Sequence, residues 1–361
     1  MPQRSRILAF DWLRGLSVVA MVQTHALALL RPALRAGEAF DAIQRIDGLV
    51  APAFTFAAGF SLALVQVRGA RAGQRGYRVR RSARRIGEVL FVGCVVNWMW
   101  FPVFREPLWL LRIDILPCIG LALLLALPLL AWLAPDPRPL PWLMVGLALA
   151  CFLAAPPAER VGGLPSRFVN VSSGSLFPLL PWAGYVCLGA AVGAVAAHGE
   201  GRRLELWLLA LSGLGWAVHL ARPLWAAVFP PHAFWVTDPT NHGNRWAIVC
   251  WVVLALLWAE RRAPAWLLRS APARVVEVFG SSSLAAYFFH EALLFKRVGG
   301  VCFEALWGSR CGWPLYAGLT AVLVAMTFGL AWAADRAYRI YDRLVSEKPI
   351  RSAGPLYGMQ A

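Results

Sequence analysis

Long apolar segments recur along the 361-residue chain and constrain its fold more than any other feature. A helix needs about 20 mainly apolar residues to cross a bilayer, and ten segments come near that length, although the fifth and eighth are short. Hydrophobic residues make up 59% of the chain and charged residues only 15%, which excludes an ordinary soluble domain. The predicted spans cover 7–30, 47–67, 86–104, 113–134, 140–156, 176–197, 204–229, 245–259, 275–297 and 315–340.

No composition shift, internal repeat or low-complexity linker divides the chain. We therefore expect an all-α integral membrane protein in which about ten transmembrane helices are bundled around a central polar cavity. A single polytopic domain is expected over residues 1–343. Residues 344–361 are expected to form a cytoplasmic tail, because this stretch contains Pro and Gly and no apolar segment.

The basic residues predict the orientation of the chain. A net charge of +16 could indicate nucleic-acid binding, but the positive residues gather in alternate loops, which is typical of the cytoplasmic side of a membrane protein. The expected partner is thus the lipid bilayer and not nucleic acid, and both termini are expected in the cytoplasm. The Ala- and Arg-rich composition favours a bacterial inner membrane. The loop after the second span holds Arg68, Arg71, Arg75, Arg78, Arg80, Arg81, Arg84 and Arg85, and Arg4, Arg6, Arg202, Arg203, Arg261, Arg262, Arg269 and Arg274 fall on the same side.

The first apolar segment carries polar residues on one face. At about 100° per residue, Arg14 and His25 return to within roughly 20° of the same azimuth, and Asp11 lies within roughly 40° of His25. An unpaired charge at the bilayer centre costs on the order of 3 kcal/mol, so this face must line a polar interior rather than lipid. The first helix is therefore expected to form one wall of an intramembrane site.

Three smaller patterns concern packing, redox state and metals. Gly189 and Gly193 form a small-xxx-small pair suited to close helix packing, and Gly59 offers a similar surface. Cys302 and Cys311 share the last outward loop, where either a disulfide or two free thiols fit the sequence. No C-x-x-C or H-E-x-x-H pattern indicates a metal, and no metal is expected.

Four motifs in chain order resemble those of a known family. The first has the pattern D-x-x-R-G followed by M-x-x-x-H, and it resembles the opening of bacterial membrane proteins related to the heparan-alpha-glucosaminide N-acetyltransferase catalytic domain. The spacing of its Arg and His is also similar to the first helix of acyltransferase family three. The motifs are Phe10-Asp11-Trp12-Leu13-Arg14-Gly15-Leu16 with Met21 and His25; Pro52-Ala53-Phe54-Thr55-Phe56 with Gly59; Arg112, Asp114, Leu116, Ile119 and Gly120; and Gly280-Ser281-Ser282-Ser283-Leu284 through Tyr287 to His290.

The chain departs from the family pattern at two points. Lysosomal relatives place their proposed catalytic histidine after the first span, but this chain has no His between Arg31 and Gly59. His25 is therefore the candidate near the first span. The fourth-span motif commonly has Gln where this chain has Pro117.

The resemblance implies an acyltransferase. It implies that an acyl group, usually acetyl, moves from cytoplasmic acyl-CoA to a hydroxyl or amine, often of a glycan, at the far face of the membrane. His25 lies about five residues from the outward end of its span, and a neutral imidazole there suits general-base catalysis. The alternative is a histidine that only makes a hydrogen bond between helices.

Further residues are assigned roles with the same kind of alternative. Arg14 is a candidate contact to the acyl donor or the oxyanion, or else a structural ion-pair partner of Asp11. Asp114 is expected either to orient His25 through a carboxylate–imidazole hydrogen bond or to pair with Arg112 at the interface. Coenzyme A carries phosphates that Arg binds well, so the arginines nearest the third span either contact them or only set topology. The candidate substrate-binding residues are Asp11, Arg112, Ser283, Tyr287 and His290, and the candidate CoA-binding residues are Arg80, Arg81, Arg84 and Arg85.

Two other functions compete with the acyltransferase. A polytopic transporter or flippase would use the buried Arg, Asp and His residues as substrate or proton sites. A non-catalytic membrane scaffold explains the hydrophobicity but gives the polar face of the first span no purpose. The sequence leaves open the acceptor, the acyl group and the oligomeric state.

Overall fold

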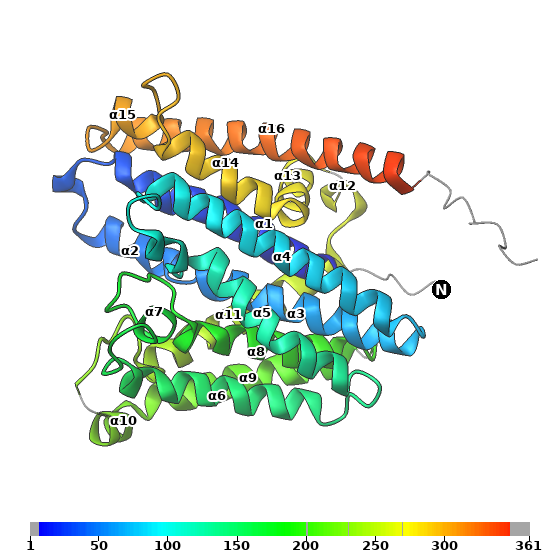
Figure 1. Cartoon of the computed structure of the whole chain (residues 1–361). Coiled ribbons are helices and arrows are strands. Elements are labelled where there is room, and N and C mark those ends of the chain that lie inside the picture. The colour runs from blue at the N-terminus through cyan, green and yellow to red at the C-terminus, as the bar shows by residue number, and fades with distance from the viewer. Residues whose placement is uncertain (1–6, 200, 230, 269, 347–361) are drawn as a thin grey trace, which may run out of the picture.

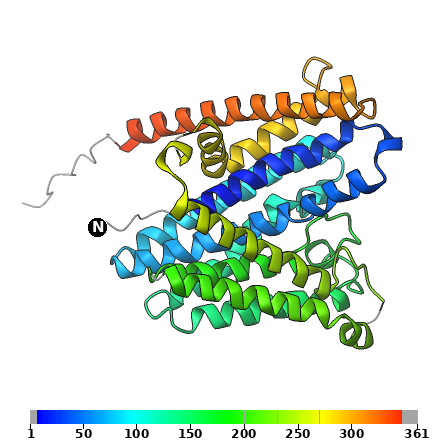
Figure 2. The same ribbon diagram turned by 180° about the vertical axis from the view of Figure 1, so that it is seen from behind.

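The computed structural model describes residues 7–199, 201–229, 231–268 and 270–346, and within these ranges every regular element is a helix. The longer helices lie mostly along one common axis, with α13 tilted away from it (Figures 1 and 2). They are α1 (Leu8–Ala26), α2 (Glu38–Asp47), α3 (Val50–Arg71), α4 (Arg75–Trp100), α5 (Ile115–Leu133), α6 (Leu140–Ala158), α8 (Leu179–Ala196), α9 (Gly201–Leu220), α11 (Pro239–Arg262), α13 (Ala271–Ser281), α14 (Ser283–Phe295) and α16 (Trp313–Ser346). Short helices connect them: α7 (Ser166–Val169), α10 (Arg222–Val228), α12 (Ala265–Leu268), α15 (Phe303–Trp307) and the 3₁₀ turns η1 (Leu27–Leu29), η2 (Pro32–Leu34) and η3 (Pro107–Leu111).

The helices match the predicted spans in position. Each of the ten predicted segments coincides with a long helix or a bent helix pair. Within the described ranges, six stretches are long and apolar enough to cross a membrane, or seven if α9 and α10, bent by 61°, form one span. The chain is therefore a helical, multi-pass membrane protein, and the count of ten crossings stays a prediction. The six stretches are Glu38–Arg71, Ile115–Leu133, Leu140–Ala158, Leu179–Ala196, Pro239–Arg262 and Trp313–Tyr338.

Large apolar side chains cover parts of the outside of the bundle. Leu125 of α5 is 68% exposed, and Trp132 and Trp142 are each 70% exposed. An exposed apolar surface of this kind is unfavourable in water but matches the hydrocarbon of a bilayer. The exterior thus agrees with the membrane assignment made from helix length.

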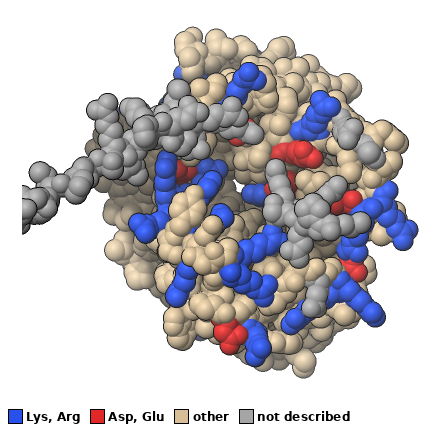
Figure 3. Space-filling view, turned by 90° about the vertical axis from the view of Figure 1, so that its right-hand side faces the viewer, with Lys and Arg blue, Asp and Glu red and all other residues tan. Residues whose placement is uncertain are grey.

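Lys and Arg side chains gather at one end of the bundle (Figure 3). α1 and α4 begin at this end and α11 reaches it with Arg261 and Arg262, as the alternation of basic loops predicts. The side of the membrane that this end faces stays a prediction. Arg4, Arg6, Arg269 and the predicted tail beyond Ser346 lie outside the described residues.

A carboxylate from another helix fixes the start of α1. The two oxygens of Glu260 in α11 accept hydrogen bonds from the backbone amides of Leu8, at 3.1 Å, and Ala9, at 3.0 Å. The first amides of a helix have no partner within the helix, and a negative charge there also interacts favourably with the helix dipole. Glu260 therefore sets the depth of α1, and with it the depth of Arg14 and His25.

Glycines allow the closest helix contacts, as the sequence predicts for α3 and α8. A Cβ at Gly189 would collide with the backbone carbonyl of Phe56, and one at Gly59 would collide with that of Val186. α1 and α13 approach in the same way, because Gly15 faces the Val276 carbonyl. The predicted packing role of the glycines is confirmed.

We expect Gly189→Ala to destabilise the protein by about 1–3 kcal/mol, the usual range for added volume in a tightly packed interface. The matched control is Gly146→Ala in α6, where a Cβ meets open space, so the better helix propensity of Ala should leave stability unchanged or raised. Thermal unfolding midpoints of the two purified variants in detergent make the comparison. An unchanged midpoint for Gly189→Ala would contradict the tight α3–α8 contact.

The predicted ninth span is not one continuous helix. α13 ends at Ser281 and α14 begins at Ser283, so the expectation of an unbroken segment over 275–297 is wrong. Serine hydroxyls compete for backbone groups and weaken a helix, and the Ser281 hydroxyl donates to the Val278 carbonyl at 3.0 Å. The break places the N-terminus of α14 directly after Ser282, whose side chain is buried.

The two cysteines of the last loop are free. Cys302 and Cys311 are both buried, and neither is part of a disulfide. The Cys302 sulfur accepts a hydrogen bond from the Ala305 amide at 3.3 Å, and the Cys311 thiol donates to the Trp307 carbonyl at 3.6 Å. Of the two alternatives that the sequence left open, the structure has two free thiols.

Candidate functional site

His25 meets two residues of α14 near the end of the bundle opposite the arginines. It is the next-to-last residue of α1, and α1 and α14 lie side by side (Figures 1 and 2). Its Nδ1 atom is 2.8 Å from Nε2 of His290 and 2.8 Å from Oε1 of Glu291. Nε2 of His290 and Oε1 of Glu291 are themselves 3.5 Å apart. We refer to His25, His290 and Glu291 as the His–His–Glu cluster.

The backbone determines the protonation pattern of a neutral cluster. Nδ1 of His290 lies 3.0 Å from the Ala286 carbonyl, which can only accept, so Nδ1 donates and Nε2 keeps its lone pair. Glu291 Oε1 is also an acceptor, and both acceptors face Nδ1 of His25. A neutral His25 therefore carries its proton on Nδ1, and its Nε2 holds a lone pair with no hydrogen bond to a described residue.

His25 is more exposed to solvent than its two partners in the cluster. The side chain of His25 is 33% exposed, whereas those of His290 and Glu291 are 0% and 6% exposed. A buried carboxylate is costly unless it is hydrogen-bonded, and the imidazole of His25 supplies that hydrogen bond to Glu291. The two partners thus fix the orientation of the His25 ring through Nδ1, and they leave the Nε2 side of the ring accessible.

Sequence reasoning missed Glu291. The signal was available, because an ionisable residue in the apolar stretch 284–295 is by default a candidate for function. The sequence offered Asp114 as the carboxylate that would orient His25, with an ion pair to Arg112 as the alternative. In the structure Glu291 makes that hydrogen bond, and Asp114 caps α5 by accepting from the Ile115 amide at 2.8 Å. This correction follows from the β-region backbone at Asp114, which points its carboxylate at the helix start.

Arg112, Asp114 and Tyr287 surround the cluster without joining its hydrogen bonds. Asp114 is partly buried and lies within electrostatic range of both His25 and Glu291, and Tyr287 lies edge-on to the His290 ring with centroids 5.4 Å apart. Arg112 does not form the alternative ion pair with Asp114. Its Nε donates to the Gly174 carbonyl at 2.8 Å, and its guanidinium lies over the Phe101 ring.

Arg14 and Asp11 lie away from the cluster. Eleven residues of α1 separate Arg14 from His25, which is about 17 Å along the axis. Arg14 forms an ion pair with Asp11, which is the second of the two roles that the sequence predicted for it. The Asp11 carbonyl packs against Gly280, next to the break in α13 and α14.

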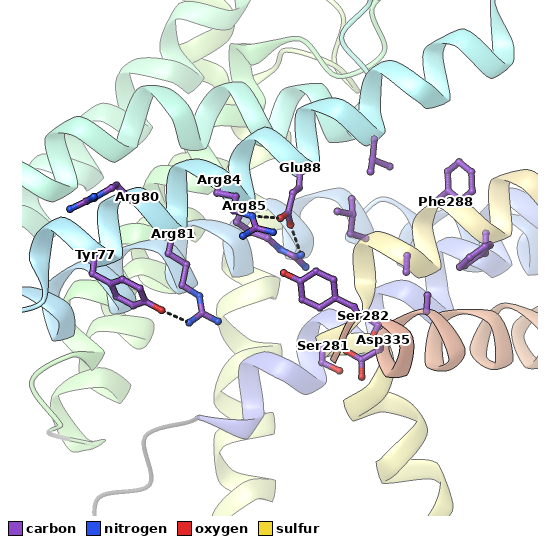
Figure 4. Close-up of a pocket in the computed structure, with 16 residues that line it drawn as sticks. Tyr77, Arg80, Arg81, Arg84, Arg85, Glu88, Ser281, Ser282, Phe288 and Asp335 are labelled. Atoms are coloured by element: carbon purple, nitrogen blue, oxygen red, sulfur yellow. Dashed lines mark hydrogen bonds and ion pairs between the residues drawn. The ribbon is translucent and has the colours of Figure 1, made fainter. Parts of the chain in front are cut away.

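A pocket of 1120 Å³ lies at the arginine-rich end, between α4, the α13–α14 break and α16. Arg80, Arg81, Arg84 and Arg85 all line it, with Ser281, Ser282 and Asp335 on the other side (Figure 4). The predicted CoA-binding arginines therefore share one pocket. A central cavity, by contrast, stays a prediction.

The four arginines differ in the partners they already have. Arg84 and Arg85 pair with Glu88 at 3.3 Å and 2.9 Å, and Arg81 donates to the Tyr77 hydroxyl at 3.0 Å (Figure 4). Arg80 has no ion pair or hydrogen bond to a described residue. Within the part of the chain that the structure describes, Arg80 and Arg81 are thus the two of these arginines that form no ion pair with Glu88.

α14 connects the pocket to the His–His–Glu cluster. Ser282, just before its first turn, lines the pocket, and His290 lies eight residues later, about 12 Å along the axis. Phe288 and Phe289, directly before His290, also line the pocket. Ser283, which the sequence grouped with Tyr287 and His290, lies near the pocket end of α14 rather than at the cluster.

Comparison with models of known families shows which family the chain matches. The model of the family described as heparan-alpha-glucosaminide N-acetyltransferase, catalytic, matches residues 6–222, which is more than half of the chain. The matched region contains His25, Asp114 and the pocket arginines, whereas α14 with His290 and Glu291 lies beyond it. No curated protein matches the chain.

Proposed function

The chain belongs to the heparan-alpha-glucosaminide N-acetyltransferase catalytic family, and on that premise we propose that it transfers an acetyl group from cytoplasmic acetyl-CoA to a hydroxyl or amine of an extracytoplasmic glycan or similar acceptor. The family match itself supports a membrane acetyltransferase. The donor, the acceptor, ten crossings around a polar cavity, a location in the inner membrane and cytoplasmic termini are parts of the proposal.

One observation carries the proposed chemistry: the lone pair on Nε2 of His25. Two acceptors, His290 and Glu291, hold the proton on Nδ1, so Nε2 is the atom that can take a proton from an acceptor. Holding a base in one tautomer and orientation is the arrangement that general-base catalysis requires. A histidine serving only as a packing contact does not need a buried carboxylate behind it.

The proposed reaction runs in one direct transfer. The acceptor oxygen or nitrogen attacks the thioester carbonyl carbon while His25 Nε2 removes its proton. The carbon–sulfur bond then breaks, and the thiolate of CoA leaves and takes up a proton, which regenerates neutral His25. The products are the acetylated acceptor and free CoA. The carboxylate of Glu291 stabilises the imidazolium that forms in between.

The pocket is the proposed place for the nucleotide end of the donor. Arg80 and Arg81 offer charge to phosphates, because neither forms an ion pair with Glu88 as Arg84 and Arg85 do. The flexible arm of CoA would then follow α14 past Phe288 toward the cluster. This route places the thioester near His25 while the phosphates stay at the basic end of the bundle.

Mass spectrometry of cell-envelope glycans tests the proposed function in cells. We expect one acetyl mark to be absent from cells that lack the gene and to return with the wild-type gene. An identical acetylation pattern in both strains would contradict an envelope acceptor. The mass and position of a lost mark would identify acceptor and acyl group together.

Reporter fusions test the orientation. Because the basic loops lie at one end of the bundle, we expect a reporter near Arg75 to be cytoplasmic and one near Pro239 to be external. Enzymatic reporters active in only one compartment distinguish the two sides. An external reporter at Arg75 would reverse the orientation and put the arginine-lined pocket on the wrong side for cytoplasmic CoA.

A further inference from the structure

Three metal-ligand atoms converge in the His–His–Glu cluster. Nδ1 of His25, Nε2 of His290 and Oε1 of Glu291 all lie within 4.8 Å of one another. They come from α1 and α14, segments about 265 residues apart, so no short sequence motif connects them. Two nitrogen ligands and one carboxylate are a donor set that zinc accepts readily.

The orientation of His290 is the one that a metal ligand needs. Its Nδ1 donates to the Ala286 carbonyl, which directs the lone pair of Nε2 into the cluster. Histidines that bind metals commonly have their other ring nitrogen anchored in this way. Glu291 is buried beside it, so its negative charge is poorly screened by water and favours a cation.

We propose that the His–His–Glu cluster binds Zn²⁺ in place of the proton on His25 Nδ1, and that the bound ion blocks acyl transfer. With Zn–N and Zn–O distances of about 2.0–2.2 Å, the ligands of a tetrahedral ion are about 3.4 Å apart. The His290–Glu291 separation of 3.5 Å already fits. The two separations of 2.8 Å from His25 must open by about 0.6 Å to reach that geometry, a shift within the range of side-chain motion.

The protein would leave one of the four coordination positions of the zinc ion without a protein ligand. The cluster supplies three ligands, and the 33% exposure of the His25 side chain leaves room for a water molecule as the fourth. The described residues supply no fourth His, Cys, Asp or Glu ligand to the cluster. Zn²⁺ bound here would therefore be exchangeable and removable by a chelator.

Zinc bound to one nitrogen of the His25 imidazole would inhibit acetyl transfer by changing the protonation of the other nitrogen. When Zn²⁺ binds Nδ1 of neutral His25, the proton on that atom moves to Nε2, so the ring remains neutral and no proton is lost overall. Nε2 then carries hydrogen and has no lone pair with which to accept a proton. This consequence rests on the proposed role of His25 as the base, whereas the binding of Zn²⁺ itself does not.

Zinc binding is measured first, without reference to catalysis. Detergent-purified full-length protein is stripped with a chelator and titrated with Zn²⁺ against a chromogenic chelator. We expect one ion per chain, and about 10²-fold weaker binding or more in Glu291→Gln and His290→Gln, since each loses a direct ligand. His198→Gln, which removes a histidine outside the cluster, should bind like wild type.

Cobalt and activity measurements complete the test. Co²⁺ in the stripped protein should give the visible absorption of a four-coordinate ion, and this absorption should be lost in Glu291→Gln. Zn²⁺ should inhibit acetyl transfer by wild type, and a chelator should restore it. Equal zinc affinity in wild type and a folded Glu291→Gln protein would overturn the site.

The remaining outcomes separate the two proposals. Stimulation of acetyl transfer by Zn²⁺ would overturn the inhibition and, with it, His25 as a metal-free base. Cluster-dependent zinc binding by a protein that transfers no acetyl group would support the site and contradict the proposed function. Correct folding of each variant is checked by its thermal unfolding midpoint and elution volume.

Discussion

Replacement of His25 by Ala should reduce acetyl transfer by about 10²-fold or more, the usual scale for loss of general-base assistance. The base is lost because Nε2 is the atom that the cluster leaves with a free lone pair. The variant should still bind acetyl-CoA, because the arginine-lined pocket is at the other end of the bundle. Initial rates with saturating donor, together with donor binding by equilibrium methods, measure both effects.

Two further variants sharpen this prediction. His25→Gln should not rescue transfer, because an amide forms hydrogen bonds but cannot accept the proton at neutral pH. His198→Gln should transfer at the wild-type rate, since His198 lies just beyond the end of α8, outside the cluster. A near wild-type rate for purified His25→Ala would place the base elsewhere, with His290 as the next candidate.

Removal of the four pocket arginines should weaken acetyl-CoA binding by about 10²-fold or more. A hydrogen bond to a charged group contributes about 1.5–3 kcal/mol, so the loss of one or two phosphate contacts accounts for this factor. Glu88, left without Arg84 and Arg85, would also repel the phosphates. The variant carries Gln in place of Arg80, Arg81, Arg84 and Arg85.

The matched control removes charge outside the pocket. Arg202→Gln with Arg203→Gln neutralises two exposed arginines at the start of α9 that do not line the pocket. This variant should bind acetyl-CoA as wild type does. Unchanged donor affinity in a correctly inserted quadruple variant would leave topology as the sole role of the four arginines.

The fold was largely predictable because a membrane-spanning helix is recognised from the hydrophobicity of about 20 consecutive residues together. Every predicted span coincides with one helix or with two consecutive helices, and the packing glycines 59, 189 and 193 lie where small residues were expected to matter. The break at Ser282 was missed, since three serines in an apolar segment change its mean hydropathy little. Their effect is local competition for backbone hydrogen bonds, which a hydropathy pattern does not register.

The site was only partly predictable because it joins residues distant in the chain. The sequence pointed to both His25 and His290 as site residues, but it offered Asp114 as the carboxylate that orients His25 and overlooked Glu291, which makes that hydrogen bond. Choosing between two carboxylates requires the register of α1 against α14, which depends on packing. The Glu260 carboxylate at the start of α1 and the close contact of Gly15 with Val276 both contribute to that register.

The candidate metal ligands were missed for a related reason. Sequence reasoning looked for local spacings such as H-E-x-x-H, where one helix presents two ligands. Here α14 contributes His290 and Glu291 as direct neighbours, and the third ligand comes from α1. Such a set becomes visible only when two helices are placed side by side.

The most direct test of the central claim is transfer of an isotope-labelled acetyl group by purified protein reconstituted in lipid vesicles. Labelled acetyl-CoA is supplied on one side, envelope glycans are supplied on the other, and the glycans are analysed by mass spectrometry. A membrane acetyltransferase with His25 as its base should produce labelled glycan with wild type and at least about 10²-fold less with His25→Ala. Transport of a substrate with no covalent product, or equal labelling by both proteins, would contradict it.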